Sequence, residues 1–224
     1  MHDGATRRGG VTRAGIVRGA RVVFERDGFF GARIEDIALE AGVAPGTFYW
    51  YFTSKADVFR EIATGVERDI GQALRPIRGG DQFLALQESI ERYLAVYRAN
   101  SAMYALMEQV AMIDDEIHQL RLAMRQKFVD RVARSIRRWQ ATGVADAGVD
   151  PVTTAGALVS MRSNFAYWWI AGGDVYDEET VVRTLTDIWA RAVGMRRPDD
   201  EATAAAPPSP SSRIVVRRRG IRAR

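Results

Sequence analysis

Residues 28–55 read GFFGARIEDIALEAGVAPGTFYWYFTSK, and this stretch decides the fold. Apolar residues three or four apart predict a short helix over 34–41. Gly42 then breaks that helix. Pro45, a residue favoured at the first position of a helix, starts a second helix of about two turns over 45–51. Two short helices joined by a glycine-containing turn predict a helix-turn-helix.

The second helix of this motif buries Phe48 and Phe52 and has an outward face that is unusual for a solvated surface. That face holds Pro45, Gly46, Thr47, Tyr49, Trp50 and Tyr51. Hydroxyl groups and an indole N–H can donate to phosphates, and small residues at the helix start let it approach base edges closely. The residues therefore favour a DNA-binding surface. Two alternatives stay open: an ordinary helical hairpin, and packing of Tyr49 and Trp50 against the first helix of the motif.

Helical periodicity continues on both sides of the motif. A helix over 12–27 precedes it and is ended by Gly28. Ser54, with Asp57 three residues later, resembles a capping box and starts a longer helix. Further helices follow: Asp150 is expected to cap the one over 151–172, and a last helix, over 177–194, follows Asp177. No convincing strand alternation occurs, so we expect an all-α fold of about nine helices.

The charge distribution suggests how the chain is divided. Residues 1–10 form an expected flexible basic arm, and 198–224 an expected disordered basic tail, rich first in Pro, Ala and Ser and then in Arg. Between them we expect a DNA-binding domain over 11–55 and a larger helical domain over 56–197. The formal net charge is +4, and basic ends suit an anionic partner. The alternative is arginine-rich coding bias, because 30 of the 32 basic residues are Arg.

Several classes of protein are excluded or disfavoured. The absence of cysteine excludes a disulfide scaffold, a thiol nucleophile and a cysteine metal site. No catalytic constellation is recognisable, and we expect no enzyme activity, no metal and no cofactor. The acidic run before His118 is interpreted as a helix start rather than a metal site. The longest apolar run, 165–173, is too short to cross a bilayer, and the first ten residues carry no hydrophobic signal region. We therefore expect a cytoplasmic protein without a membrane partner.

Residues 12–60 resemble the DNA-binding domain of the tetracycline-repressor-like (TetR/AcrR) family of bacterial one-component regulators. The matching residues are Phe24, Gly28, Phe29, Ile37, Ala38, Ala41-Gly42-Val43, Gly46-Thr47-Phe48-Tyr49, Tyr51-Phe52 and Ser54-Lys55. The resemblance implies that the outward face defined above meets DNA and that Lys55 pairs with a phosphate. Arg33 departs from the family pattern, which has Ser or Thr there as a helix cap. We expect Arg33 to contact DNA instead.

For the larger domain the resemblance implies a ligand pocket and a dimer interface. The expected ligand contacts are Met103, Met107, Phe128 and Phe165, because Met and aromatic side chains line adaptable apolar pockets. Asn164 or Arg162 could orient a polar group of the ligand. Arg121, Arg125, Arg131 and Arg138 are expected on a solvated face, although one of them could meet an acidic ligand head. The expected dimer contacts, in a four-helix interface, are Trp168, Trp169, Leu185 and Trp189.

These observations predict a homodimeric repressor that binds a near-palindromic operator in double-stranded DNA. A small apolar effector would release it, with coupling through the helix that starts at Ser54. The alternative is an architectural or constitutive DNA-binding protein without a ligand, whose affinity would be mostly controlled by salt. An enzyme hidden in the helical bundle is a third hypothesis, which would need a pocket with strongly perturbed titrating groups.

Overall fold

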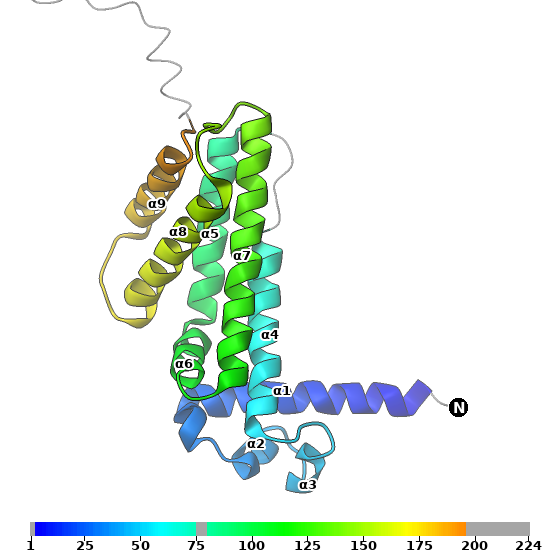
Figure 1. Cartoon of the computed structure of the whole chain (residues 1–224). Coiled ribbons are helices and arrows are strands. Elements are labelled where there is room, and N and C mark those ends of the chain that lie inside the picture. The colour runs from blue at the N-terminus through cyan, green and yellow to red at the C-terminus, as the bar shows by residue number, and fades with distance from the viewer. Residues whose placement is uncertain (1–2, 75–79, 196–224) are drawn as a thin grey trace, which may run out of the picture.

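The computed structural model describes residues 3–74 and 80–195. All secondary structure in these ranges is helical, which confirms the predicted all-α class with nine α-helices (Figure 1). The elements are α1 (Asp3–Gly31), α2 (Ile34–Glu40), α3 (Pro45–Phe48), α4 (Lys55–Ala73), α5 (Gln82–Ala99), α6 (Ser101–Ala111), α7 (Asp115–Ala141), α8 (Pro151–Ala166), a π-helical turn (Tyr167–Ala171) and α9 (Glu178–Ala192).

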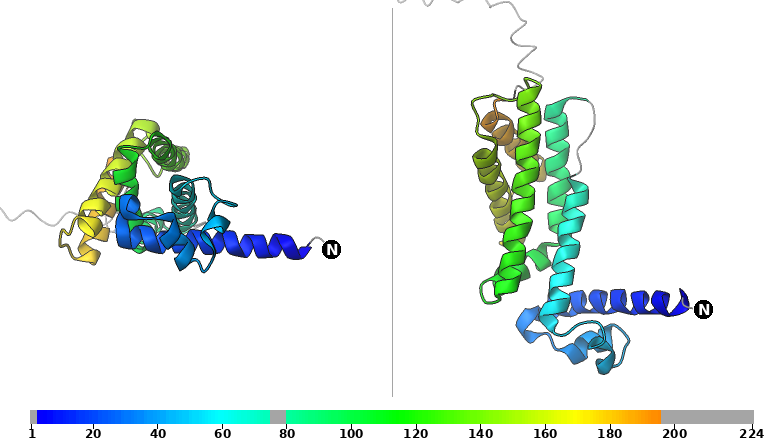
Figure 2. Two further views of the ribbon diagram at one scale, coloured as in Figure 1. Left: turned by 90° about the horizontal axis from the view of Figure 1, so that it is seen from below. Right: turned by 45° about the vertical axis from the view of Figure 1, so that its right-hand side comes forward.

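The helices form a long bundle with a small helical unit across one end. Helices α4, α5 and α7 run along the bundle, and α8 and α9 pack along its side (Figures 1 and 2). Helix α1 lies across the lower end of the bundle, and α2 and α3 lie beneath it. The helix-turn-helix therefore forms the lower tip of the molecule, away from the free end of the bundle.

The first helix is longer than the sequence predicted. Its backbone is helical from Asp3, so residues 3–10, expected to be an arm, belong to α1 and the predicted start at Thr12 is wrong. Extending an existing helix adds one hydrogen bond per residue and avoids the cost of nucleation, which explains why weakly patterned residues can join it. The predicted end is confirmed, because Gly28 has φ 72° and kinks the chain. The predicted tail over 198–224 lies outside the described residues.

The predicted helix starts are confirmed at three N-caps. The Ser54 hydroxyl accepts a hydrogen bond from the Asp57 backbone N–H at 3.2 Å. The Asp150 carboxylate accepts from the backbone N–H of Thr153 at 2.7 Å. Asp177 accepts from the third residue of α9 at 2.9 Å. These bonds satisfy amide groups that have no partner within their own helix, and they fix where α4, α8 and α9 begin.

Two clusters of buried apolar side chains hold the fold together. The lower core joins α1–α4 to α6 and the first half of α7; its members include Ile16, Ala20, Val23, Phe24, Ile37, Phe48, Phe59, Met103 and Ile117. The upper core joins the rest of the bundle to α8 and α9; its members include Ile90, Leu94, Ile136, Leu158, Trp169, Leu185 and Trp189. Because the lower core runs from the helix-turn-helix into α6 and α7, the end that carries this motif is packed directly against the larger domain.

Candidate DNA interface and ligand cavity

The helix-turn-helix is held from inside by its apolar residues. Ile37 and Ala38 of α2 and Phe48 of α3 are buried, as predicted. Gly42 has φ 67° in the turn between the helices, a conformation that glycine adopts without steric cost. Helix α3 is a single turn, shorter than the predicted 45–51, because the chain turns after Phe48 and returns to the core at Phe52.

The outward side of this motif carries most of the residues predicted to meet DNA. Trp50 is 85% exposed, and Pro45, Gly46 and Tyr49 are also exposed. Thr47 is half-buried. The packing alternative is therefore wrong for Trp50. Tyr51 is different, because it is partly buried and packs against the lower core.

Arg33 occupies the predicted cap position without capping the helix. It is the N-cap residue of α2 and makes no side-chain cap hydrogen bond, as the departure from the family pattern predicted. Its exposed guanidinium lies 3.7 Å (Nε to Oε2) from the carboxylate of Glu35. An exposed pair of this kind is weak and can be exchanged for another anion at little cost.

Lys55 has a different role from the predicted phosphate contact. Its ammonium donates to the backbone carbonyl oxygens of Phe29 (2.8 Å), Phe30 (3.2 Å) and Ala32 (3.2 Å). It also lies 5.0 Å from the centre of the Phe29 ring. An ammonium group has three hydrogens to donate, and these contacts account for all of them. Lys55 therefore ties the start of α4 to the segment after Gly28, and the predicted phosphate contact is corrected to this structural one.

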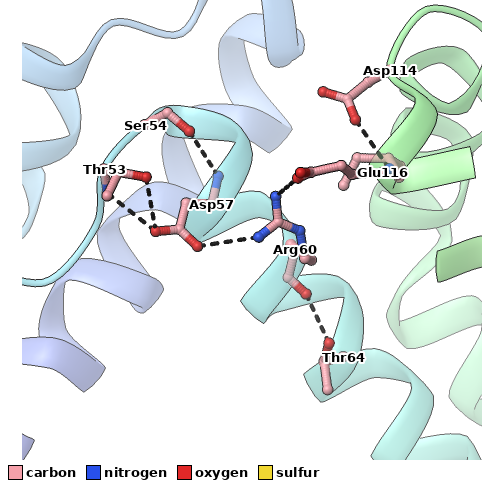
Figure 3. A network of polar contacts seen from close by, with 8 residues as sticks. Thr53, Ser54, Asp57, Arg60, Thr64, Asp114 and Glu116 are labelled. Atoms are coloured by element: carbon pink, nitrogen blue, oxygen red, sulfur yellow. Dashed lines mark hydrogen bonds and ion pairs between the residues drawn. The ribbon is translucent and has the colours of Figure 1, made fainter. Parts of the chain in front are cut away.

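A polar network joins the helix-turn-helix to the larger domain (Figure 3). The Asp57 carboxylate accepts a hydrogen bond from the backbone N–H of Thr53, just after the motif, at 3.1 Å. Arg60 bonds Asp57 at 3.4 Å and also pairs with Glu116, in the first turn of α7. Asp114 is the N-cap of α7, which confirms that the acidic run before His118 is a helix start. The network therefore connects the chain after α3 with the N-terminus of α7.

The bundle contains a cavity of about 610 Å³ between α4, α5, α6, α7 and α8. It is lined by Ile70, Tyr93, Tyr97, Tyr104, Met107, Glu108, Arg121, Met124, Arg125, Phe128, Val159, Ser160, Ser163, Asn164, Tyr167 and Trp168. Of the predicted ligand contacts, Met107 and Phe128 line it. Met103 instead lies in the lower core, and Phe165 packs against Trp169 and Tyr176, so these two predictions are wrong.

The cavity wall combines aromatic rings with paired polar groups. The rings of Tyr97 and Tyr104 stack in parallel, with centroids 4.2 Å apart, and burial raises the pKa of both hydroxyls. Arg121 Nε donates to Glu108 at 2.7 Å. Arg125 donates to the Ser160 hydroxyl at 2.9 Å. These tyrosines were not among the four expected ligand contacts. The sequence signal that could have selected them is a hydroxyl-bearing residue within an apolar helix stripe, because a buried O–H needs a partner.

The predicted dimer contacts divide between the surface and the core. Trp168 is 54% exposed. Trp169, Leu185 and Trp189 are at most 9% exposed and lie in the upper core of their own chain, so they cannot reach a second copy and the prediction is wrong for them. Each of the two helices keeps a large apolar residue exposed, Val152 on α8 and Ile188 on α9. Periodicity alone does not say which side faces the protein's own bundle.

The fold and the exposed helix-turn-helix define a DNA-binding transcriptional regulator. The family model for bacterial regulatory proteins of the tetR family matches residues 16–62, and the model for the C-terminal domain of the transcriptional regulator EthR matches residues 86–194. The chain belongs to the TetR/AcrR family. Within the described residues, no helix combines the length and the apolar character needed to cross a membrane.

Individual relatives agree with this assignment. The chain is 22% identical over 186 residues to the regulator SrpR of Pseudomonas putida, covering 80% of this chain and 84% of SrpR. It is 38% identical over 61 residues to AcrR of Shigella flexneri, covering 27% of this chain and 28% of AcrR. It is also 32% identical over 82 residues to the uncharacterized regulator YfiR of Bacillus subtilis, covering 37% of this chain and 38% of YfiR.

Solved structures share the fold. Salmonella enterica GusR superposes with a TM-score of 0.70 at 19% identity, over 82% of this chain and 95% of GusR. The fatty acid degradation regulator FadR of Bacillus halodurans superposes with a TM-score of 0.65 at 18% identity, over 83% of this chain and 97% of FadR. At these identities the likeness establishes the architecture and leaves the ligand to be argued from this chain's own residues.

Proposed function

We propose that this chain is a homodimeric repressor that binds a near-palindromic operator in double-stranded DNA and is released by a small effector. The observation that carries the DNA-binding part is the exposed Trp50 beside Tyr49 at the tip of a motif whose inner face is closed by Phe48. Two adjacent exposed aromatic rings on a rigid scaffold are typical of a surface that another molecule covers. DNA is the partner that a helix-turn-helix of this family meets.

The DNA-contacting residues that we propose lie on one end of the molecule. Pro45, Gly46 and Thr47 form the start of α3, where they would approach base edges. Tyr49 and Trp50 would contact the sugar-phosphate backbone and bases, and Tyr51 would do so with its hydroxyl while its ring stays packed. Arg33 would exchange its exposed pairing with Glu35 for a phosphate or a guanine.

The cavity supports the effector part of the proposal. Its volume of about 610 Å³ lies within the range of roughly 300–1,000 Å³ that is usual for small-molecule sites. Met107 and Phe128 supply adaptable apolar contact, and Asn164 can orient a polar group. Helix α7 lines the cavity and is bonded to α4 through Glu116 and Arg60, so a ligand that displaces α7 would also act on the DNA-binding end.

A dimer is supported by the outer faces of α8 and α9. Val152 of α8, Ile188 of α9 and Trp168 of the π-helical turn after α8 are exposed large apolar residues. Val175 and Tyr176 are exposed in the connection that leads to α9. Two copies that pair through these faces would present two recognition motifs to two half-sites of an operator. A regulator of this kind would act in the cytoplasm, where bacterial chromosomal DNA lies.

Selection from random duplex DNA at ~150 mM salt, followed by a screen for compounds that release the selected DNA, tests this proposal. We expect a near-palindromic sequence and a compound that releases it. A matched control is Leu84→Ala, an exposed apolar residue of α5, far along the chain from the motif. It should select the same sequence.

The outcomes separate the candidate functions. A selected sequence that no compound releases would contradict the effector part and leave a constitutive DNA-binding protein. Binding to all sequences alike, lost as salt rises, would contradict the repressor and favour an architectural protein.

A further inference from the structure

Arg162 of α8 carries a buried charge directly behind the cavity wall. It is 2% exposed, and its guanidinium carbon lies 3.7 Å from the centre of the Tyr93 ring and 5.4 Å from that of Trp189. Tyr93 is one of the residues that line the cavity. Burial lowers the pKa of Arg162, because removal from water disfavours its charged form. Arginine nevertheless keeps its proton in proteins, so the charge has to be stabilised by what surrounds it.

The described surroundings of Arg162 provide rings and hydroxyls rather than a carboxylate. The groups that act on its charge are Tyr93 and Tyr104, and no ion pair between described residues includes it. The faces of the two aromatic rings offset part of the cost of burial. Taking a guanidinium out of water carries a large free-energy cost, and cation–π contacts alone do not offset all of it.

Donor groups at this end of the cavity also have no acceptor among the described residues. Nε and Nη2 of Arg162, Nε1 of Trp189 and Oη of Tyr104 are buried and have no hydrogen-bond partner. Tyr104 lines the cavity, and burial raises the pKa of its hydroxyl, so this group keeps its proton and can donate. Buried polar atoms are nearly always paired in native proteins, and what this group of atoms needs is an acceptor.

The charged side chains that line the cavity also favour a negatively charged ligand. Arg121 is paired with Glu108, and Arg125 meets only the uncharged Ser160 and the Gly156 carbonyl among its hydrogen-bond partners. Two carboxylates oppose the arginines: Glu108 in the lining, and Asp69, whose charge acts on the Tyr104 hydroxyl. Together with Arg162 behind the wall, three arginines outnumber these two carboxylates. A cavity of low dielectric constant strengthens the effect of each uncompensated charge on a bound molecule.

We propose that the effector is an organic anion: an apolar, aromatic-sized body with one carboxylate or sulfonate group. The anionic group lies beside the Tyr104 hydroxyl, where it accepts a hydrogen bond and faces the charge of Arg162. The apolar body lies against Met107, Met124 and Phe128. This inference rests on the proposed function of the cavity as an effector site, and it specifies the chemical class of the effector.

Two fluorescent probes that share an aromatic body test the proposal on the full-length protein. 1-Anilinonaphthalene-8-sulfonate carries a negative charge, and N-phenyl-1-naphthylamine is its neutral counterpart. Each probe is titrated by fluorescence against wild-type protein and variants whose thermal unfolding has been checked. Phe128→Ala should weaken both probes, which locates them in the cavity. Arg138→Met, an exposed arginine of α7, should weaken neither.

The decisive variants remove the charge or the donor. Arg162→Met should weaken the anionic probe about tenfold or more, the loss expected for a hydrogen bond or contact with a charged group, and leave the neutral probe nearly unchanged. Tyr104→Phe removes only a hydroxyl and should weaken the anionic probe about threefold or more. It keeps the test decisive if Arg162→Met fails to fold.

The alternative outcomes separate the two levels of the proposal. If neither probe binds wild-type protein saturably at one site per chain, the cavity is not an effector site and the proposed function fails with it. If both probes bind and neither Arg162→Met nor Tyr104→Phe changes the ratio of their affinities, the cavity is retained as the effector site and the anion proposal is overturned. Arg162 is then a structural cation held between two rings.

Discussion

The DNA-binding end and the bundle of this protein are both made of α-helices, yet their interiors differ. At the DNA-binding end, Ile16, Phe24, Phe48 and Phe59 are fully buried in a closed apolar core. The bundle contains a cavity of about 610 Å³ and a buried arginine, Arg162, which pairs with no carboxylate among the residues that the structure describes. The first interior fixes a shape, which a DNA-reading surface needs. The second is incompletely packed and incompletely paired, which suits a region that receives a ligand.

The largest difference should appear when one phenylalanine is truncated in each region. Phe48→Ala leaves a hole in the closed lower core and should cost about 3–5 kcal/mol of unfolding free energy. Phe128→Ala only enlarges an existing cavity and should cost about 1–2 kcal/mol. Urea unfolding of both variants measures the difference between the two losses of unfolding free energy. Equal costs would contradict the view that the two interiors are packed differently.

The next effect separates affinity for DNA from stability. Trp50→Ala removes an exposed side chain, so unfolding free energy should change by less than about 0.5 kcal/mol. Binding to the selected operator should weaken by about 1–3 kcal/mol, or roughly 5- to 150-fold, as for the loss of a good DNA contact. Fluorescence anisotropy with labelled operator measures it. Leu84→Ala on α5 is the matched control, and a similar loss of affinity there would indicate a non-specific effect.

A smaller effect should come from the link between the two regions. Arg60→Met removes the guanidinium that pairs with both Asp57 and Glu116. We expect operator affinity to fall about threefold while the unfolding free energy changes by less than about 1 kcal/mol, as is usual for exposed pairs. The control is Lys127→Met, because Lys127 pairs with Glu67 at 2.7 Å and joins the same two helices away from the motif. If both variants weaken operator binding alike, the position of the Arg60 link has no special role.

The smallest effect concerns the helix caps, which also differ between the regions. Ser54 caps α4 with an uncharged hydroxyl, whereas α8 and α9 are capped by carboxylates, Asp150 and Asp177. Backbone hydrogen bonds from Thr153 and Thr180 hold the pKa of these carboxyls below the usual value.

A carboxyl with a lowered pKa stabilises the fold above its ordinary pKa of about 3.9, and this contribution is lost as the pH falls through the lowered value. Asp177→Asn keeps a good cap without the charge, so its melting temperature should lie slightly below that of wild type at pH 6 and meet it near pH 2. Melting curves from pH 6 to pH 2 measure the difference in melting temperature between the variant and wild type. Ser54→Ala is the uncharged comparison, and its deficit should not depend on pH. If the difference for Asp177→Asn does not change with pH, the charge of the Asp177 carboxylate does not stabilise the start of α9.

The sequence by itself determined the features that depend on local chemistry. Gly28 and Gly42 end or turn the chain because only glycine takes positive φ without strain, and Ser54, Asp150 and Asp177 start helices because their side chains reach unpaired amides. The all-α class and the helix-turn-helix followed from the same local rules. The family resemblance was visible because its motif is contiguous.

Only the tertiary structure decided which partner each apolar helix face packs against. Large apolar residues are common at ligand and dimer contacts, but packing of neighbouring helices buries several of them in a core or against other rings. These are Met103, Phe165, Trp169, Leu185 and Trp189. Lys55 was expected to meet a phosphate, and its reach to three carbonyls depends on where α1 ends in space. Periodicity reports that a face is apolar, whereas the partner of that face is set by contacts between residues far apart in sequence. The cavity and the buried charge of Arg162 arise from those contacts alone.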